Sequence, residues 1–254
     1  MEQAFDVIGS KEKAVAIIDQ TEDPKKVAEE IMKKHKNVKS VLMKLGGREG
    51  VYRIYELKLI KGDENTEVIH KENGYLLQLD PKKAYFSPRE STERMRIAEI
   101  VKPKEKILIM FSGIGPYAIA ISKKKPETEI TCVEINLDAV KYAEKNIQLN
   151  KINNVKNYCW DVKDARGLGT FDRIIMPLPE TAVEFLDSAF ICAKKGTIIH
   201  IYGVSNQKEK FTDLKQKIEE AAETLNMSFK FAGGQRVLPF APRMWKVRLD
   251  LKII

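Results

Sequence analysis

The sequence of 254 residues has few of the features that mark membrane, secreted or metal-binding proteins. No apolar run approaches the roughly 18–20 residues that a membrane span needs, and residues 1–15 lack the basic-then-apolar pattern of a secretory signal. Cysteine and histidine occur three times each, and the cysteines (Cys132, Cys159 and Cys192) lack a metal-ligand spacing. We therefore expect a cytoplasmic protein with buried thiols, no membrane association and no metal site.

Basic residues outnumber acidic ones. The chain has 44 Lys and Arg against 36 Asp and Glu, which gives a formal net charge of +8 and a pI near 9.2. This balance favours a polyanionic partner such as a nucleic acid, because phosphate contacts dominate non-specific nucleic-acid affinity. A lysine-rich surface without such a partner is the alternative, and it also occurs in proteins from hot environments. With 43% hydrophobic residues, the chain can form one large domain or two modest ones.

The first part of the chain predicts a small α+β unit with mainly antiparallel strands. Asp23-Pro24 begins a helix, and Asn73-Gly74 is a strong hairpin signal. Strands are expected at 38–45, 52–60, 68–70 and 75–79, and a helix at 90–100. We place a domain boundary at residue 85, which separates residues 1–85 from residues 86–254.

From Ile107 onward, predicted strands and helices alternate, which indicates an α/β architecture. Strands are expected near 107–111, 130–134, 155–160, 171–176 and 197–202, and helices near 116–124, 137–149, 180–192 and 207–226. The tail predicts a closing antiparallel hairpin at 228–232 and 245–253. Parallel units followed by such a hairpin predict a Rossmann-like fold with a mixed seven-stranded sheet.

A glycine turn joins the first two strands of this region. The buried strand Ile107–Phe111 leads into Ser112-Gly113-Ile114-Gly115, a helix follows, and the next strand ends in Glu134. This is the layout of a nucleotide-type cofactor site, in which the acid accepts hydrogen bonds from ribose hydroxyls. The pattern G-x-G-P lacks a third glycine, which favours S-adenosyl-L-methionine (SAM) over a dinucleotide; a ligand-free βαβ unit is the alternative. The predicted cofactor contacts are Phe111, Gly113, Ile114, Gly115, Glu134 and Ile135.

Two later strand ends are expected at the same crevice, because ligands bind at the carboxyl ends of the strands in such sheets. Asp161 ends a predicted strand, where this fold usually places a contact to the adenine amino group; an aspartate that caps a turn or helix is the alternative. Pro177-Leu178-Pro179 ends the next strand. We predict cofactor contacts at Asp161, Val162 and Leu178, a catalytic position at Pro177 and a substrate contact at Pro179.

A second cluster of functional residue types, Tyr85–Arg94, lies just before the glycine-turn strand. Arginines on either side of a glutamate could bind phosphates and supply one base. A capped amphipathic helix with exposed ion pairs is the alternative, and composition alone favours it.

Several segments together resemble the archaeal-type tRNA (guanine-37 N1) methyltransferase family, namely residues 35–57, 72–99, 110–121, 176–187 and 236–253. The runs FSPRESTER and GIGPYAI are the most specific of these. The resemblance implies a class I SAM-methyltransferase domain preceded by a small α+β RNA-binding domain. It also implies SAM as cofactor and the anticodon stem-loop of tRNA as partner, and we expect a monomer. An N-terminal domain that reads the tRNA elbow is common in the family, and we do not expect it within this sequence.

The resemblance also assigns roles to single residues. Arg53 matches the arginine that holds guanine O6, Glu93 matches the general base for guanine N1, and Arg89 and Arg94 match basic neighbours of the RNA. The chemistry is consistent, because removing the N1 proton places negative charge on O6, which a cation stabilises. Two positions depart from the family pattern: Ile109 replaces an aspartate, and Pro177 replaces an asparagine.

The primary hypothesis is therefore N1 methylation of guanosine 37 in tRNA. A related alternative is a wyosine-pathway enzyme at the same tRNA position, either a methyltransferase for a wyosine intermediate or an aminocarboxypropyl transferase. The arginine of FSPR and the proline of GIGP favour methyl transfer over aminocarboxypropyl transfer. An RNA-binding module that has lost its chemistry and a protein or small-molecule methyltransferase are the remaining alternatives.

Overall fold

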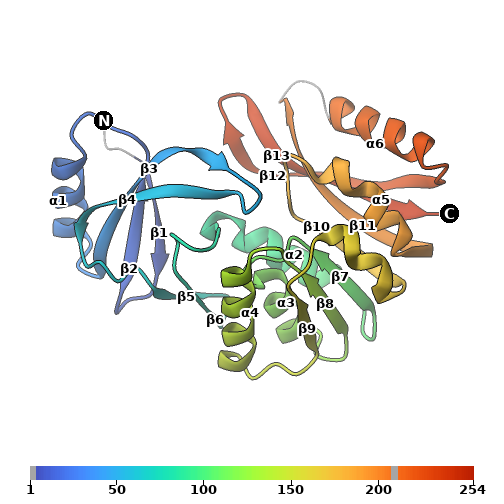
Figure 1. Ribbon diagram of the computed structural model, residues 1–254, viewed down its shortest axis with the longest axis horizontal. Coiled ribbons are helices and arrows are strands. Elements are labelled where there is room, and N and C mark those ends of the chain that lie inside the picture. The colour runs from blue at the N-terminus through green and yellow to red at the C-terminus, as the bar shows by residue number, and fades with distance from the viewer. Residues whose placement is uncertain (1–3, 207–210) are drawn as a thin grey trace.

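Two sheets and a separate hairpin make up the structure, a computed structural model that describes residues 4–206 and 211–254. The smaller sheet has the strand order β1-β2-β3-β4, and α1 (Pro24–Lys34) packs against β3 and β4 (Figure 1). Its strands are β1 (Phe5–Gly9), β2 (Ala14–Ile18), β3 (Val38–Glu49) and β4 (Ile54–Gly62). The pairs β1–β2 and β3–β4 are antiparallel, whereas β2 and β3 are parallel because α1 forms the connection between them.

The sequence predicted α1, β3 and β4 but not β1 and β2. All five residues of β2 are buried, so the strand has no alternation of polar and apolar residues. Such a short apolar run cannot be distinguished from a buried helical segment by periodicity. The missed strands complete the smaller sheet and give it its own core of Ala14, Ile18, Ile31 and Val41.

The predicted hairpin is present as β5 (Val68–Glu72) and β6 (Tyr75–Leu79). Its turn has positive φ at Asn73 (46°) and Gly74 (83°), as a tight hairpin turn requires. The outer edge of β6 is paired with side chains of α4 (Leu137–Leu149) and its C-cap: Asn146 and Asn150 each exchange hydrogen bonds with the backbone of β6. These amides satisfy a strand edge that would otherwise lack partners. The hairpin is thus attached to the helices of the larger sheet.

The larger sheet has the strand order β12-β13-β11-β10-β7-β8-β9. Strands β9, β8, β7, β10 and β11 are parallel, and β13 runs antiparallel between β11 and β12. The seven strands are β7 (Lys106–Met110), β8 (Glu129–Val133), β9 (Val155–Tyr158), β10 (Phe171–Met176), β11 (Ala193–Asn206), β12 (Phe229–Ala241) and β13 (Met244–Ile253). This confirms the predicted α/β fold with a mixed seven-stranded sheet.

Helices cover both faces of this sheet. Ile107 and Ile109 of β7 face the core beneath α2 (Ser91–Ile100), α3 (Pro116–Lys124) and α4. Leu108 and Met110 face the opposite core, beneath α5 (Leu186–Ile191) and α6 (Thr212–Thr224). Because both faces are buried, β7 is apolar at four consecutive positions, as is usual for parallel strands. Ile109, the first departure from the family pattern, is therefore a core residue.

Some predicted boundaries were wrong. The helix expected at 180–192 consists of a 3₁₀ turn (Ala182–Phe185) followed by the short α5. The helix expected at 207–226 is α6, which spans Thr212–Thr224, and residues 207–210 lie outside the described residues. The closing hairpin is longer than predicted, because β12 extends through Gly233-Gly234 with irregular register.

The order of the strands in the larger sheet indicates where the functional region lies. Connections from β7 lead to β8 and β9 on one side, whereas β10 and β11 lie on the other. The crevice outside the carboxyl ends of β7 and β10 is the position where open α/β sheets bind ligands.

Candidate active site

A cavity of ≈ 460 Å³ opens at the carboxyl ends of β7, β8 and β10. Its volume is within the range of small-molecule sites. The walls come from the β3–β4 turn, the segment before α2, the glycine turn after β7, the ends of β8 and β9, the segment after β10, and β13. Residues from both sheets therefore meet at one cavity.

The glycine turn has the backbone geometry that its sequence suggests. Gly113 and Gly115 have φ of 55° and 81°, in the left-handed region that glycine adopts without steric cost. Gly115 is the N-cap of α3, and Pro116 follows at the first helical position. Phe111 also has a positive φ, 55°, which is uncommon for a residue with a side chain and is frequent at functional sites. Its ring contacts Phe185 at a centroid distance of 5.0 Å.

Glu134 lies opposite this turn and is bonded to it. Its Oε2 accepts a hydrogen bond from the Gly113 N–H at 2.8 Å, and its Oε1 accepts one from the Asn136 N–H at 2.9 Å. Desolvation raises the pKa of Glu134, and these backbone hydrogen bonds oppose that effect. A carboxylate oxygen has two lone pairs, so each oxygen retains capacity for a ribose hydroxyl. The chemistry of these groups therefore fits the ribose of SAM.

The adjacent wall offers an apolar slot with one carboxylate. Ile135, Val162 and Leu178 line the cavity together with Trp160 and Asp161. Asp161 accepts a hydrogen bond from the Lys163 N–H at 3.0 Å, so it caps the 3₁₀ turn Val162–Leu168 while it faces the cavity. The capping role and a cofactor role are therefore compatible, and the slot is suited to a flat heteroaromatic ring with an amino group.

The β3–β4 turn delivers Arg53 to the same cavity. Arg53 has a φ of 49°, and its Nη1 donates to Glu180 Oε2 at 2.6 Å while Nη2 lies 3.4 Å from Thr181 Oγ1. The turn of the smaller sheet is thereby joined to the segment that follows β10. Pro177 and Pro179 of this segment also line the cavity. A guanidinium has five N–H donors, more than these two contacts use.

The comparisons with known proteins agree with this geometry. Residues 68–230 match the family described as the TRM5/TYW2 methyltransferase domain. The chain belongs to this family. It is 40% identical to the tRNA (guanine(37)-N(1))-methyltransferase Trm5b of Pyrococcus abyssi, over 98% of this chain and 74% of that protein.

Two solved structures have the same fold. A complex of aTrm5 with tRNALeu matches with a TM-score of 0.86 and 30% identity, over 99% of this chain and 72% of that chain. TYW2 of M. jannaschii in complex with AdoMet matches with a TM-score of 0.74 and 26% identity, over 99% of this chain and 100% of that chain. The resemblance and the class I methyltransferase fold are confirmed, and SAM is the cofactor of the family.

The structure gathers most of the predicted site residues but not all of them. The predicted residues that line the cavity are Arg53, Phe111, Gly113, Glu134, Ile135, Asp161, Val162, Pro177, Leu178 and Pro179. Ile114 is buried in the core, and Gly115 packs against Ala143 of α4. Both residues are part of the glycine turn but do not line the cavity. The individual roles of these residues stay predictions.

The three predicted site residues of the FSPRESTER segment, Arg89, Glu93 and Arg94, lie outside the cavity wall, whereas Glu90 of the same segment lines it. Arg89 is 55% exposed at its side chain and pairs with Asp6 at 2.6 Å. Arg94 is 1% exposed and binds Glu72 through two nitrogens, at 2.7 and 2.6 Å. Glu93 is 3% exposed and accepts hydrogen bonds from Tyr202 at 2.6 Å and Arg248 at 2.9 Å. The ion pairs of Arg94 and Glu93 are buried, whereas composition favoured exposed ones.

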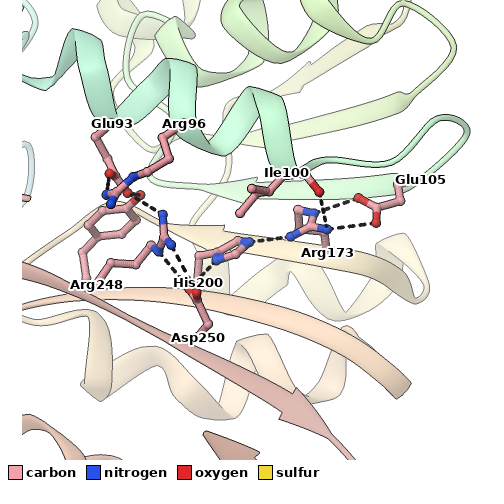
Figure 2. A network of polar contacts seen from close by, with 9 residues as sticks. Glu93, Arg96, Ile100, Glu105, Arg173, His200, Arg248 and Asp250 are labelled. Atoms are coloured by element: carbon pink, nitrogen blue, oxygen red, sulfur yellow. Dashed lines mark hydrogen bonds and ion pairs between the residues drawn. The ribbon is translucent and has the colours of Figure 1, made fainter. Parts of the chain in front are cut away.

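Glu93 is one end of a buried polar network that joins α2 to the centre of the sheet (Figure 2). Arg248 links Glu93 to Asp250, and His200 links Asp250 to Arg173. Arg173 Nη1 lies 2.6 Å from His200 Nε2, and a guanidinium can only donate, so Nε2 must be the acceptor. His200 is therefore a neutral imidazole that donates from Nδ1 to Asp250 at 2.6 Å. Burial lowers the pKa of His200, which agrees with this assignment.

Sequence reasoning missed several residues that line the cavity, among them Asn136, Trp160, Phe185 and Lys246. Tyr85 and Glu90 belong to the predicted functional cluster Tyr85–Arg94, but neither was assigned a role of its own. Asn136 could have been found, because an asparagine just before a helical pattern is a typical N-cap, and its side chain caps α4. Lys246 had no such signal, since it is one of several basic residues in an alternating strand. Within residues 4–206 and 211–254, no group of three His, Cys, Asp or Glu side chains could hold a metal ion. No helix in the same ranges is both long and apolar enough to cross a bilayer.

Proposed function

We propose that the protein transfers a methyl group from SAM to N1 of guanosine 37 in the anticodon loop of tRNA. The observation that carries this proposal is the position of Arg53. A turn of the smaller sheet places this guanidinium at the cavity that also contains the glycine turn and Glu134. The proposed cofactor site and a cation for the acceptor base would thus share one cavity. The family membership and the 40% identity to Trm5b support the same reaction.

The cofactor-side residues would hold SAM by its nucleoside. Glu134 would accept hydrogen bonds from the ribose hydroxyls. Asp161 would accept one from the adenine amino group, and the adenine ring would lie between the apolar side chains of Ile135 and Leu178. When bound, SAM supplies an electrophilic methyl group on a sulfonium. The chain's task is to orient the acceptor nitrogen in line with that group, which is a proximity effect.

The acceptor side has to stabilise charge. Guanine N1 carries a proton, and its removal places negative charge on O6. Arg53 would donate to O6, and its contacts with Glu180 and Thr181 fix the direction of the guanidinium before the base arrives. Pro177 and Pro179 would form a wall beside the base. Because proline has no backbone N–H, neither residue would donate a main-chain hydrogen bond to the polar edge of the base.

The resemblance assigns the N1 proton to Glu93. In the structure this carboxylate lies in the buried network and contacts Tyr202, Arg248 and Arg96. Glu93 is not among the residues that line the cavity, so direct proton transfer to it would need these contacts to rearrange when the substrate binds. The effect of Glu93→Gln on turnover, with SAM affinity measured in parallel, tests this assignment.

Two observations support tRNA as the partner, namely the net charge of the chain and the position of an exposed arginine. The net charge is +8, and Arg89 is exposed on the segment that leads into α2. We propose residues 1–85 as the RNA-binding domain and 86–254 as the catalytic domain, in a monomeric cytoplasmic enzyme. The affinity for tRNA should fall steeply with salt if phosphates are contacted. An affinity that does not change with salt would count against RNA as the partner.

The decisive experiment is nucleoside analysis of a tRNA transcript after incubation with the pure protein and SAM labelled on its methyl group. The expected product is 1-methylguanosine, and a transcript with adenosine at position 37 should remain unlabelled. A larger adduct without the methyl label would indicate aminocarboxypropyl transfer. If SAM binds and neither transcript is modified, the proposed reaction is wrong.

A further inference from the structure

Exposed aromatic side chains gather at the cavity. Within residues 4–206 and 211–254, four aromatic residues are exposed, namely Tyr52, Tyr85, Trp160 and Phe240. Three of them line the cavity: Tyr52 is 52% exposed, Trp160 40% and Tyr85 38%. An exposed aromatic ring forgoes the free energy that burial would provide, and a group of such rings marks a surface that a ligand covers.

Tyr52 lies on the β3–β4 turn, which extends from the smaller sheet toward the larger one (Figure 1). The turn is closed by a hydrogen bond from the Arg53 N–H to the Gly50 carbonyl at 3.3 Å. Val51, its neighbour in the turn, is 73% exposed and also lines the cavity. The turn therefore presents apolar side chains to solvent directly before the guanidinium that faces the cavity.

Trp160 reaches the cavity from the larger sheet, in the short segment between β9 and the 3₁₀ turn Val162–Leu168. The centroid of its ring lies 4.5 Å from that of Tyr158, with an angle of 45° between the two planes. Tyr158 in turn packs against the core beneath α5 and α6. The protein thus supports the Trp160 ring from one side, so little further ordering is needed before a flat ligand stacks on it.

The proposed adenine slot uses other side chains. It is formed by aliphatic residues that are buried or half-buried, namely Ile135, Val162 and Leu178. The exposed rings are accompanied by cations instead: Arg53 follows Tyr52, and the Lys163 ammonium lies 5.8 Å from the centroid of the Phe185 ring, which also lines the cavity. Aromatic rings interspersed with cations are typical of surfaces that bind single-stranded nucleic acid, where bases stack on the rings.

On the basis of the proposed function, we propose that Tyr52 and Trp160 form an aromatic rim on which bases of the anticodon loop stack, next to the guanosine that enters the cavity. An enzyme that modifies a base takes it out of its stack, which removes stacking contacts from the neighbouring bases. Aromatic side chains bind the unstacked bases of RNA loops in this way. The aromatic rim replaces the lost contacts, whatever the identity of the flanking bases. The RNA surface thus includes residues of the larger sheet as well as residues 1–85.

The test is the affinity for a fluorescently labelled guanosine-37 transcript, measured by anisotropy over a range of salt concentrations with S-adenosyl-L-homocysteine at saturation. Tyr52→Ala and Trp160→Ala should each weaken binding by about 5–150-fold, the usual contribution of one stacked base. The dependence of affinity on salt should keep its slope, because no phosphate contact is removed. SAM affinity from calorimetry should remain within about threefold, and circular dichroism should show the normal fold.

Matched variants separate stacking from a general loss of structure. Tyr52→Phe and Trp160→Phe keep an aromatic ring, so their affinity for the transcript should stay within about threefold of that of the unmodified protein. Phe240→Ala is the control, because Phe240 is 38% exposed but lines a neighbouring hollow together with the acidic residues Glu184 and Glu220. Its removal should leave the affinity unchanged.

A fluorescence measurement tests the contact without altering the aromatic rim. The chain has two tryptophans, and Trp245 is half-buried and does not line the cavity. Trp245→Phe therefore leaves Trp160 as the single tryptophan. Addition of the unlabelled transcript to this variant, with S-adenosyl-L-homocysteine already bound, should quench its emission, because a stacked base quenches indole fluorescence.

The outcomes are distinct. If both alanine variants fold and bind the transcript normally, the aromatic rim does not contact RNA. If Trp160→Ala weakens SAM binding instead of transcript binding, Trp160 belongs to the cofactor site and the proposal is wrong. If Trp160→Ala does not fold, the absence of quenching in Trp245→Phe overturns it. If the alanine variants weaken transcript binding as expected but the unmodified protein makes no 1-methylguanosine, the proposed reaction fails and the RNA contact stands.

Discussion

Glu72 and Arg94 form a buried ion pair that joins the β5–β6 hairpin to α2. Arg94 Nε and Nη2 donate to the two carboxylate oxygens at 2.7 and 2.6 Å, and Tyr75 donates its hydroxyl to Glu72 at 2.5 Å. Arg94 also donates to the Ser87 carbonyl at 3.1 Å. The pair holds the segment that carries Glu90 and Arg89 against the hairpin. Glu72→Gln is therefore an informative change, because it removes one charge and conserves the shape.

The magnitude follows from burial and the pKa of Glu72. Burial by itself would raise this pKa, but hydrogen bonds from His70 and Arg94, together with the guanidinium charge, lower it from 4.5 to about 2. This difference corresponds to about 3 kcal/mol of stability, at about 1.4 kcal/mol per pKa unit. The contribution is complete above about pH 4.5 and is lost as the pH falls toward 2. Because Arg94 would stay buried without a counter-charge, Glu72→Gln should cost about 3–5 kcal/mol at pH 7.

The assay is urea denaturation followed by circular dichroism, at pH 7 and at several lower pH values. The stability difference between Glu72→Gln and the unmodified protein should shrink as the pH falls from 4.5. The double variant Glu72→Gln with Arg94→Met should be more stable than Glu72→Gln alone, since it removes the unpaired charge. Glu64→Gln, an exposed control, should change stability by less than about 0.5 kcal/mol. A Glu72→Gln loss below about 1 kcal/mol that does not vary with pH would refute the reasoning.

Three further predictions concern the site and its support. Arg53→Ala should lower the methyl-transfer rate by about 10²–10³-fold with little change in SAM affinity, as measured by single turnover and calorimetry. Glu134→Gln should weaken SAM binding by about 10-fold or more in calorimetry, because hydrogen bonds to a charged acceptor are replaced by weaker ones. His200, whose pKa is lowered by burial, should remain neutral with its proton on Nδ1 at pH 6 in nitrogen-15 NMR. Its contribution to stability should be complete above about pH 6.5 and be lost at lower pH; a charged His200 at pH 6 would contradict the network.

Features with a local cause could be predicted from the sequence. The Asn73-Gly74 turn, the glycine turn and the acid at the end of β8 were found because left-handed φ values and strand ends leave a signature in a few adjacent residues. The mixed seven-stranded sheet followed from the alternation of strands and helices and from the resemblance, whereas the order of its strands came from the structure. The fully buried β2 was missed because it has no alternation to detect.

Only the tertiary structure decided which charged residues are exposed, which are buried in ion pairs and which line the cavity. Within FSPRESTER, the segment leaves Arg89 exposed, buries Arg94 against Glu72, and places Glu90 rather than Glu93 at the cavity. Arg53 meets Glu180 across 127 positions, and Arg248 meets Glu93 across 155. A charged side chain carries no local mark of its distant partner, and whether it is buried depends on which strand or turn arrives opposite it. The sequence by itself therefore determined the fold and the cofactor turn, whereas long-range packing decided which charged side chains line the cavity.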